Sequence, residues 1–452
     1  MLFNARQAAF EILNDLDQGQ ATLDTLLEKF NAKNATISRR DRALFQTLVF
    51  GVLRWRGRLD FIIAHFSRTR FDKIDPRVLN ILRLALFQII YLDRIPESAA
   101  VNTAVEIAKT AVAPWVVGFV NAVLRKAVRD FQNLSFPSIQ KNAIAATAVS
   151  TSFPEWIIRR WIGRWGLEAT SALCDALNTI PAITIRTNRL KTSPRDLIKA
   201  LASEAEQVER TSYAPDGITF VSPTTSIPGL SAFKSGWFQV QDEAAQLVSL
   251  LLSPQPGETV LDACAGLGGK TGHIAQLMKN EGSITAIDIH EEKLLELESE
   301  MMRLGVTIVT TSCRNLEKAK INQQLGPFDR ILLDAPCSGL GVVRRNPDIK
   351  WRAAKKNLAK FKNKQLALLE NLSLLVKSSG SLVYAVCSPE PEENENVVND
   401  FLKNHREFVI DKQAEGLPDK IRSMQTANGW FKTFPHFNHM DGFSFVRLKQ
   451  TQ

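Results

Sequence analysis

A glycine-rich turn that joins a short apolar strand to a helix constrains the fold of this 452-residue chain more than any other feature. The strand covers Thr259–Ala263, and the turn carries glycines at positions 266, 268 and 269. The next strand, Ser283–Asp288, ends in an acidic residue. This order of strand, glycine turn, helix and acidic strand end is typical of the ligand-binding edge of a parallel α/β sheet. We therefore expect a ligand between the glycine turn and Asp288.

Short apolar strands alternate with amphipathic helices through the carboxyl half. The expected strands are Thr259–Ala263, Ser283–Asp288, Val306–Thr311, Arg330–Leu333 and Leu382–Ala385. Apolar strands separated by helices belong to a parallel sheet that is covered on both faces. The pattern predicts a Rossmann-like, doubly wound α/β domain over residues 239–452, with the first crossover helix over Gly272–Met278.

The amino half of the sequence has the pattern of consecutive helices. Apolar residues recur at helical spacing up to about Gln132, which predicts an all-α domain over residues 1–132. Asp75 followed by Pro76 marks a helix start, because it combines a capping side chain with the residue best tolerated in the first turn. The chain is too long for a single core, so several domains are expected.

Two further segments separate these domains. Residues 133–178 are expected to form a helical linker over Glu155–Asn178, with Trp156, Trp161 and Trp165 packed in a core. Residues 179–238 contain short β-prone pieces around a helical stretch, which predicts a small α/β module. We expect this module to bind RNA. Its expected strands are Ile183–Thr187 and Ile218–Val221, and its helix is Pro194–Ser203.

The spacing of the glycines distinguishes between the classes of ligand that such a turn can bind. A phosphate-binding P-loop needs a glycine five residues before Gly269, where Cys264 stands. A dinucleotide fingerprint that starts at Gly266 needs a glycine at position 271, where Thr271 stands. Asp288 lies at the distance at which an acidic side chain reaches ribose hydroxyls. These features favour a nucleoside cofactor without a pyrophosphate, and S-adenosylmethionine is the leading candidate.

Two cysteines follow the ends of two expected strands. Asp334-Ala-Pro-Cys337-Ser-Gly follows one strand, and Cys387-Ser-Pro follows another. The carboxyl ends of the strands in a doubly wound sheet face the ligand crevice, so both thiols should point to the substrate site. Cys174 and Cys313 are interpreted as small buried hydrophobes, and Cys264 as a packing residue near the cofactor.

Paired thiols suit methylation of a pyrimidine carbon. Carbon 5 of cytosine is too weak a nucleophile to attack a sulfonium methyl group, but a thiolate that adds to carbon 6 makes carbon 5 nucleophilic. Asp334 is expected to hydrogen-bond the ring nitrogen and amino group while the adduct forms. The adduct must then lose the carbon-5 proton and eliminate the thiol, which gives the second cysteine a role in release.

Composition and charge limit which binding partners and which cellular compartment are expected. A net charge of +9 and a pI near 9.3 suit a polyanionic partner. A cluster of arginines is either a solvated helix face or an RNA-facing patch: Arg39, Arg40, Arg42, Arg54, Arg56 and Arg58. The five cysteines form no C-x-x-C pair, so neither a zinc site nor any other metal site is expected. No secretory signal or membrane-spanning run is present, and we expect a cytoplasmic protein with reduced thiols.

With these residues in hand, the chain resembles the RNA 5-methylcytosine methyltransferases, most closely the RsmB (Fmu/Sun) type that acts on bacterial small-subunit ribosomal RNA. The resemblance is carried by Gln241-Asp-Glu-Ala-Ala, Asp262 to Thr271, Ala286-Ile-Asp288, Leu333 to Gly339, Arg345-Asn-Pro-Asp-Ile-Lys-Trp351, Tyr384 to Asn394 and Asp441-Gly-Phe-Ser-Phe. The amino half resembles the family's NusB-like RNA-binding domain, chiefly through Pro96–Lys109 and Val120–Lys126.

The resemblance implies roles for individual residues. Cys387 matches the family's nucleophile, and Cys337 matches the cysteine that assists product release. The implied cofactor-binding residues are Cys264, Ala265, Gly266, Leu267, Gly268, Gly269, Lys270, Asp288 and Asp334. The implied cofactor is S-adenosylmethionine, and the implied partner is small-subunit (16S) ribosomal RNA.

The chain departs from the family pattern at two places. The third strand is usually followed by a cofactor-contacting Asp, but this chain reads Thr311-Ser-Cys-Arg-Asn315. The family's Thr before the nucleophile is Val386 here, and Pro389 follows Ser388. We expect the first departure to alter adenosine binding and the second to alter the turn after the nucleophile.

Three alternative functions remain open at this stage. Transfer RNA is an alternative substrate, because related catalytic halves act on it. A non-enzymatic RNA-binding or ribosome-assembly factor would need only the amino domain, which leaves Asp334, Cys337 and Cys387 unexplained. An enzyme that uses nicotinamide is disfavoured by the glycine spacing. The helical amino domain favours ribosomal RNA.

Overall fold

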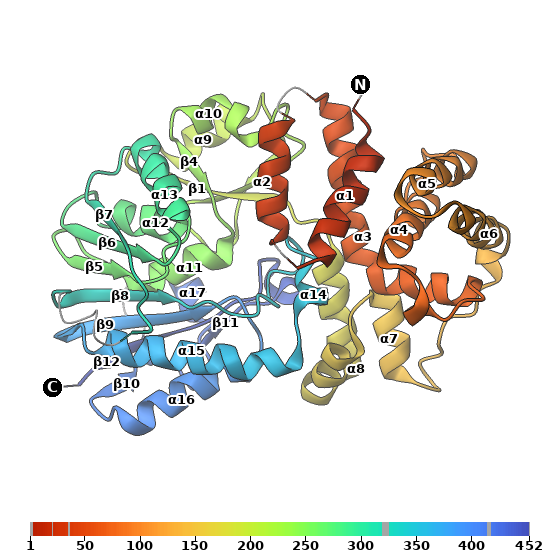
Figure 1. Cartoon of the computed structure of the whole chain (residues 1–452). Helices are drawn as coiled ribbons and strands as arrows, with labels where there is room; N and C mark the ends of the chain where they lie inside the picture. Colours follow the sequence, from red (N-terminus) through yellow and green to blue (C-terminus); the bar gives the residue numbers. More distant parts are fainter. Residues whose placement is uncertain (1–2, 20, 35–36, 319–324, 414–416, 452) are drawn as a thin grey trace. The chain divides into compact units, whose positions relative to one another are not determined.

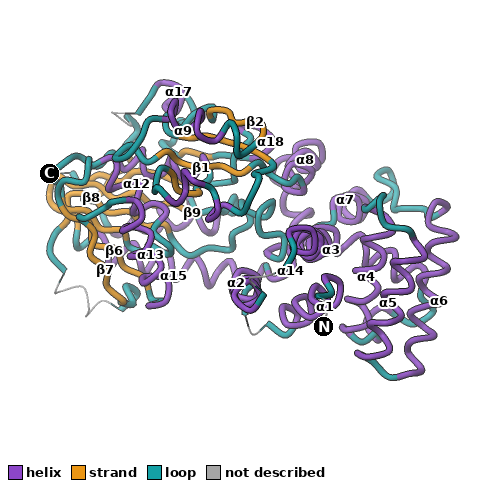
Figure 2. The backbone as a smooth tube through the Cα atoms, turned by 90° about the horizontal axis from the view of Figure 1, so that it is seen from above, coloured by secondary structure: helices purple, strands orange, loops and turns teal. Residues whose placement is uncertain are grey.

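The protein is described by a computed structural model that covers residues 3–19, 21–34, 37–318, 325–413 and 417–451. The chain divides into a helical unit, Met1–Thr179 with Val343–Arg352, and an α/β unit, Ile180–Val342 with Ala353–Gln452. Among the described residues, strands lie only in the α/β unit (Figure 1 and Figure 2). No helix in these ranges is long and apolar enough to cross a membrane.

The helical unit confirms the expected all-α amino half. Its helices are α1 (Ala5–Asp17), α2 (Leu23–Lys33), α3 (Arg39–Phe66), α4 (Pro76–Tyr91), α5 (Glu97–Ala111), α6 (Pro114–Asp130), α7 (Ala143–Thr151), α8 (Glu155–Asn178) and α14 (Ile349–Arg352). The side chain of Asp75 accepts a hydrogen bond from the Arg77 N–H at 2.8 Å, and Pro76 occupies the first turn of α4, as expected. Trp161 is fully buried, which confirms its packing role.

A segment that lies between two strands of the α/β unit in the sequence belongs to the helical unit. Within Val343–Arg352, Lys350 is fully buried. Its ammonium donates to the carbonyl oxygens of Arg54 at 2.7 Å and Ser152 at 2.9 Å, and to Asn178 Oδ1 at 2.9 Å. Burial lowers the pKa of Lys350 well below its ordinary value. Three acceptors that surround one ammonium therefore fix this segment to α3, α7 and α8.

A small antiparallel sheet opens the α/β unit. Its elements are β1 (Ile183–Thr187), α9 (Pro194–Leu201), β2 (Glu206–Arg210), β3 (Gly217–Val221), α10 (Ser231–Lys234) and β4 (Phe238–Val240). The strand order is β2-β3-β1-β4, and apolar residues of β1, β3 and β4 pack against α9 and α10. We call residues 180–240 the small module. The strands expected at its start and middle are confirmed, and β2 and β4 were not expected.

The large sheet confirms the doubly wound domain. Its strands are β5 (Thr259–Asp262), β6 (Ser283–Asp288), β7 (Val309–Cys313), β8 (Phe328–Asp334), β9 (Val376–Val386), β10 (Phe408–Ile410), β11 (Phe431–Lys432) and β12 (Ser444–Gln450). The main strand order is β10-β12-β9-β8-β5-β6-β7. Strands β5 to β9 pair in parallel, and β12 runs antiparallel to β9.

Helices cover both faces of this sheet. They are α11 (Glu243–Leu252), α12 (Gly269–Leu277), α13 (Glu291–Leu304), α15 (Lys355–Ser373), α16 (Glu395–Asn404), α17 (Asp419–Arg422) and α18 (Pro435–Asn438). Val260, Leu332 and Val383 pack with residues of α11, α12 and α13. Their sequence neighbours Leu261 and Leu333 point to the opposite face and pack with α15 and α16. Because neighbouring residues of each strand pack against helices on opposite faces of the sheet, these strands are apolar throughout.

Several element boundaries differ from expectation; β8 and β9, for example, extend beyond the expected Arg330–Leu333 and Leu382–Ala385. The third strand was expected at Val306–Thr311 but begins at Val309. Gly305 ends α13 with φ +76°, and the Val306 N–H bonds back to the carbonyl of Met301, so Val306 belongs to the helix cap. The first crossover helix begins at Gly269, before the expected Gly272.

Candidate active site

The expected site residues follow the carboxyl ends of neighbouring parallel strands. The glycine turn follows β5, Asp288 ends β6, Asp334 ends β8, and Cys387 follows β9. Because β6, β5, β8 and β9 lie side by side in this order, their ends form one edge of the sheet. The sheet therefore brings together residues that are more than 120 positions apart in the sequence.

The glycine turn is held open by its backbone conformation. Gly266 has φ +54°, and its N–H donates to Asp288 Oδ2 at 3.0 Å. A Cβ at Gly266 would meet no atom within 4 Å, so the turn borders open space on this side. Gly268 has φ +80°, and a Cβ there would lie 2.6 Å from Leu297 Cγ. The first glycine thus leaves room for a ligand, and the second allows α13 to pack closely.

Asp288 borders a hollow of about 230 Å³ beside this turn. Its Oδ1 accepts from the His290 N–H at 3.0 Å, so backbone donors hold both of its oxygens. Each oxygen keeps a lone pair for a further donor. Other residues that line the hollow are Cys264, Gly266, Arg314, Asn315, Glu317, Asp334 and Lys364. A carboxylate fixed beside a hollow in this way suits ribose hydroxyls.

Two further cysteines are placed by the structure. Cys264 lines the hollow and packs partly against the core, as expected, and burial raises the pKa of its thiol. Cys313 was interpreted as a buried hydrophobe, and this interpretation is wrong. Cys313 is exposed, because it is the last residue of the edge strand β7, and its Sγ contacts the carbonyl of Ile289 at 3.6 Å.

Other polar side chains line the hollow where the segment after β7 lacks a carboxylate. Arg314 and Asn315 line the hollow, and Arg314 Nε donates to Ser312 Oγ at 2.8 Å. Glu317, farther along the segment, also lines the hollow and pairs with Lys364 at 2.9 Å. This edge of the hollow therefore offers an amide, a guanidinium and a displaced carboxylate where the family pattern has an Asp.

Asp334 and Lys270 form an ion pair at the centre of the site. Lys270 Nζ lies 2.5 Å from Asp334 Oδ2, and the side chains are 12% and 28% exposed. Burial lowers the pKa of Lys270, but the charge and hydrogen bond of Asp334 outweigh this effect and raise the pKa above its ordinary value. Lys270 therefore stays cationic and holds one oxygen of Asp334.

The thiols of Cys337 and Cys387 are in contact. Their Sγ atoms lie 3.3 Å apart, and both cysteines are free and partly exposed. A hydrogen bond to Cys387, together with burial, raises the pKa of Cys337 well above its ordinary value. Cys337 therefore keeps its proton, and its thiol is able to donate a hydrogen bond to Cys387 Sγ.

Glu393 holds the two cysteine-bearing loops together and was not anticipated from the sequence. It is fully buried and accepts from the Ser338 N–H and Oγ, both at 2.6 Å, and from Ser388 Oγ at 2.5 Å. Ser338 and Ser388 directly follow Cys337 and Cys387. Burial raises the pKa of Glu393, and the serine hydrogen bonds act in the opposite direction. One carboxylate thus fixes both turns that present the thiols.

The departure at Val386 is accommodated in the core. Val386 is fully buried at the end of β9, opposite Ser444 of β12. The turn that follows is held by Glu393 through Ser388, as described above. Glu393 therefore fixes the direction of Cys387 without help from a hydroxyl at position 386.

Replacing Asp288 with Ala is expected to weaken binding of S-adenosylhomocysteine by about 1 to 3 kcal/mol, since the ribose would lose hydrogen bonds to a charged group. Asp288→Asn keeps one acceptor oxygen, so it should lose less affinity for this ligand than Asp288→Ala. Calorimetric titration measures both effects. Asp419→Ala is a matched control, because its carboxylate is 95% exposed. An unchanged affinity in Asp288→Ala would rule out this assignment.

Three segments of the chain match known protein families. Residues 249–449 match the model of the 16S rRNA methyltransferase RsmB/F. Residues 3–129 match the NusB family, and residues 153–226 match the RsmF/B-like ferredoxin-like domain. In chain order, the first match lies in the helical unit, the second covers α8 and most of the small module, and the third covers the large sheet.

Curated relatives and solved structures extend over the full length. The "Probable ribosomal RNA small subunit methyltransferase B" of Bacillus subtilis is 37% identical over 99% of both chains. That of Synechocystis is 35% identical over 99% of this chain and all of the relative. The solved structure of PH0851 superposes over both full chains with a TM-score of 0.82 and 26% identity. This chain belongs to the 16S rRNA methyltransferase RsmB/F family.

Proposed function

We propose that this protein methylates carbon 5 of a cytosine in small-subunit ribosomal RNA, with S-adenosylmethionine as donor and Cys387 as covalent nucleophile. The contact of two thiols at 3.3 Å, at the sheet edge that also carries Asp288 and Asp334, is the observation that carries the proposal. Family membership supports the methyl transfer and the ribosomal RNA. A non-enzymatic role would leave the paired thiols without a purpose.

The cofactor fits the open space at the glycine turn. Gly266 leaves room for it, and the carboxylate of Asp288 would hold its ribose. When bound, S-adenosylmethionine supplies an electrophilic methyl group. The chain's own residues must therefore activate carbon 5 of the base, which is otherwise a poor nucleophile.

Cys387 activates the base by forming a bond from Sγ to carbon 6. Because Cys337 keeps its proton, its thiol would donate a hydrogen bond to Cys387 Sγ before attack. Asp334 would hydrogen-bond the amino group and the ring nitrogen once that nitrogen carries a proton, and this proton neutralises the negative charge that develops on the ring.

After methylation, water takes the proton from carbon 5, and its electron pair re-forms the double bond between carbons 5 and 6. The bond from carbon 6 to sulfur breaks, which releases the Cys387 thiolate, and the ring nitrogen returns its proton. The Cys337 thiol would promote this release by donating a hydrogen bond to the departing sulfur.

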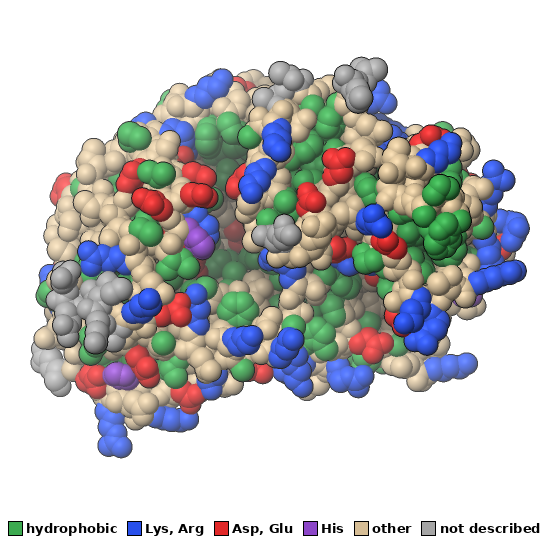
Figure 3. All heavy atoms as spheres, viewed as in Figure 1, with side chains coloured by type: hydrophobic (Ala, Val, Ile, Leu, Met, Phe, Trp, Pro, Cys, Tyr) green, Lys and Arg blue, Asp and Glu red, His purple; other side chains and the backbone are tan. Residues whose placement is uncertain are grey.

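The RNA is held by charge spread over the surface. The face in Figure 3 shows Lys and Arg side chains throughout, with Asp and Glu between them, in a chain of net charge +9. The arginine cluster of the helical unit is not a single RNA-facing patch. Arg54 is buried and donates to the carbonyl of Arg344 at 2.8 Å, and Arg56 pairs with Asp17 at 2.7 Å. These two side chains stabilise the fold of the unit.

Bisulfite sequencing of RNA tests the proposal. Small-subunit ribosomal RNA from cells with the protein should contain a protected cytosine that becomes convertible in cells without it. The wild-type gene should restore protection, and a gene with Cys387→Ala should not. A protected cytosine lost only from transfer RNA would change the substrate, and no change in any RNA would contradict cytosine methylation.

A further inference from the structure

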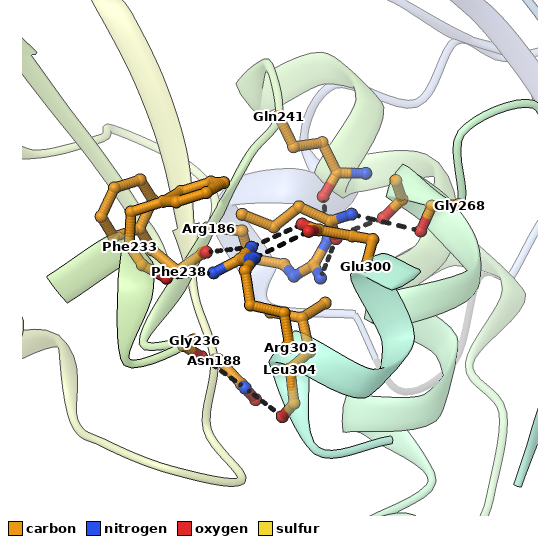
Figure 4. A network of polar contacts seen from close by, with 12 residues as sticks. Arg186, Asn188, Phe233, Gly236, Phe238, Gln241, Gly268, Glu300, Arg303 and Leu304 are labelled. Carbon is orange, nitrogen blue, oxygen red and sulfur yellow. Dashed lines mark hydrogen bonds and ion pairs between the residues drawn. The ribbon is translucent and has the colours of Figure 1, made fainter. Parts of the chain in front are cut away.

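A buried arginine joins the small module to the glycine turn. Arg186 of β1 is 1% exposed, and its guanidinium donates to the carbonyl of Gly269 and to Gln239 Oε1, both at 2.8 Å. It also donates to Gln241 Oε1. Figure 4 shows this network between the strands of the small module and the start of α12. Burial lowers the pKa of Arg186 to about 9, so its neutral acceptors only partly replace water.

A second set of hydrogen bonds joins the small module to α13. Arg303 donates to the carbonyls of Phe233 and Phe238 at 2.5 and 2.9 Å. Asn188 Nδ2 donates to the carbonyls of Gly236 and Leu304, both at 2.8 Å (Figure 4). These contacts hold β1 and β4 at a fixed position against the glycine turn. The position of Arg186 is therefore fixed both by its own hydrogen bonds and by those of Arg303 and Asn188.

Arg186 also fixes the orientation of the Gln241 amide. Because Oε1 of Gln241 accepts from Arg186, its Nε2 must point the other way, as Figure 4 shows. Gln241 is 6% exposed, and its Nε2 has no hydrogen-bond partner within the described ranges. A buried donor without an acceptor is costly, so an acceptor is expected from outside the chain.

The unpaired amide lines a second hollow, of about 110 Å³. This hollow shares Cys264 and Asp334 with the first one, and Lys270 lies in its wall. Asp262 also lines it. Asp262 is 1% exposed, and its Oδ2 accepts from Thr271 Oγ1 at 2.7 Å. Its Oδ1 has no partner among the residues that the structure describes.

The two unpaired atoms are complementary to an amino-acid group. Gln241 Nε2 and the Lys270 ammonium are donors that suit a carboxylate, and Asp262 Oδ1 is an acceptor that suits an ammonium. Burial raises the pKa of Asp262 to about 6, so a cation beside it would stabilise its ionised form. A single water fills about 30 Å³, which is well below the volume of this hollow.

We propose that Gln241 and Asp262 bind the amino-acid end of the methyl donor, and that Arg186 is the positioning residue that aims the Gln241 amide. The strands of the small module thereby complete the cofactor site. This inference rests on the proposed use of S-adenosylmethionine. It adds residues outside the glycine turn to the set that the family resemblance implies.

Titration of the full chain with two ligands tests the proposal. S-adenosylhomocysteine carries the amino-acid end, and 5′-methylthioadenosine lacks it. Gln241→Met keeps the length of the side chain and removes the donor, so it should weaken binding of S-adenosylhomocysteine about tenfold or more. Its affinity for 5′-methylthioadenosine should stay within about twofold of the wild type. Gln255→Met makes the same change at an exposed glutamine and should alter neither affinity.

Arg186→Lys tests the positioning role. Arg186 binds four acceptors through a planar guanidinium, since Gln276 Oε1 also accepts from its Nε at 3.4 Å. A lysine ammonium has only three donors and no planar fork, so the Gln241 amide should lose its fixed orientation. Binding of S-adenosylhomocysteine should fall, and adding Gln241→Met should cause little further loss, because both changes act on one contact. Thermal melting with 5′-methylthioadenosine present checks that the variant is folded. Fully additive losses would overturn the positioning role.

The outcomes separate this inference from the proposed function. If the wild type binds neither ligand, both proposals fail. If it binds both and Gln241→Met binds S-adenosylhomocysteine normally, only the Gln241 assignment fails. Equal losses for both ligands would also overturn it, because they would indicate a general distortion of the adenosine hollow.

Discussion

Cys387→Ala is expected to abolish methyl transfer to small-subunit ribosomal RNA, with a loss on the order of 10⁴-fold or more. Without this thiol no bond to carbon 6 can form, and carbon 5 stays too weak a nucleophile. Cys337 cannot replace it, because burial and its hydrogen bond raise the pKa of that thiol and keep it protonated. The measurement is transfer of a labelled methyl group from S-adenosylmethionine to the RNA.

Binding should separate a chemical defect from a folding defect. Cys387→Ala removes one sulfur from a turn that Glu393 holds through Ser388, so affinities for cofactor and RNA should remain within about twofold. Cys313→Ala is a matched control, because Cys313 is an exposed cysteine at another strand end. Its activity should match that of the wild type. Activity of Cys387→Ala above about a tenth of the wild-type level would remove covalent catalysis from the mechanism.

The convergence of the thiols could be predicted because it depends on topology alone. Cys337 and Cys387 each follow a parallel strand, and the ends of parallel strands meet at one edge whatever the local packing. The same rule placed Asp288 beside the glycine turn, where the Gly266 N–H contacts its carboxylate. These strands are apolar on both faces, so their pattern is strong in the sequence.

Elements that depend on tertiary contacts could not be predicted. Strand β2 reads Glu-Gln-Val-Glu-Arg and is mostly exposed, so it lacks the apolar pattern of a strand. The Val343–Arg352 segment lies between catalytic elements in the sequence, yet Lys350 fixes it to the helical unit through three acceptors distant in the sequence. No local signal indicates such partners.

The roles of Glu393 and Arg186 were missed for the same reason. A glutamate in an acidic stretch usually faces solvent, and only the structure shows Glu393 buried between Ser338 and Ser388. Arg186 lies in a strand with apolar alternation, and its acceptors come from β4, α12 and the loop before α11. A charged residue inside an otherwise apolar strand is the signal that points to it.

Cys337→Ala is expected to trap a covalent complex between the protein and the RNA. Attack by Cys387 and methylation of carbon 5 do not require the Cys337 thiol, although loss of its hydrogen bond should slow attack by about tenfold. Release does require it, because it lies 3.3 Å from the sulfur that must leave carbon 6. The methylated adduct should therefore accumulate as a species that survives denaturing electrophoresis.

Three controls define the trapped species. It should require S-adenosylmethionine, since a reversible adduct without methylation returns to free RNA. It should disappear in the double variant Cys337→Ala, Cys387→Ala, because the bond is made by Cys387. Ribonuclease should reduce it to the mobility of the free chain. Trapping in Cys387→Ala and none in Cys337→Ala would exchange the two roles, whereas full turnover without trapping in Cys337→Ala would show that release proceeds without a second thiol.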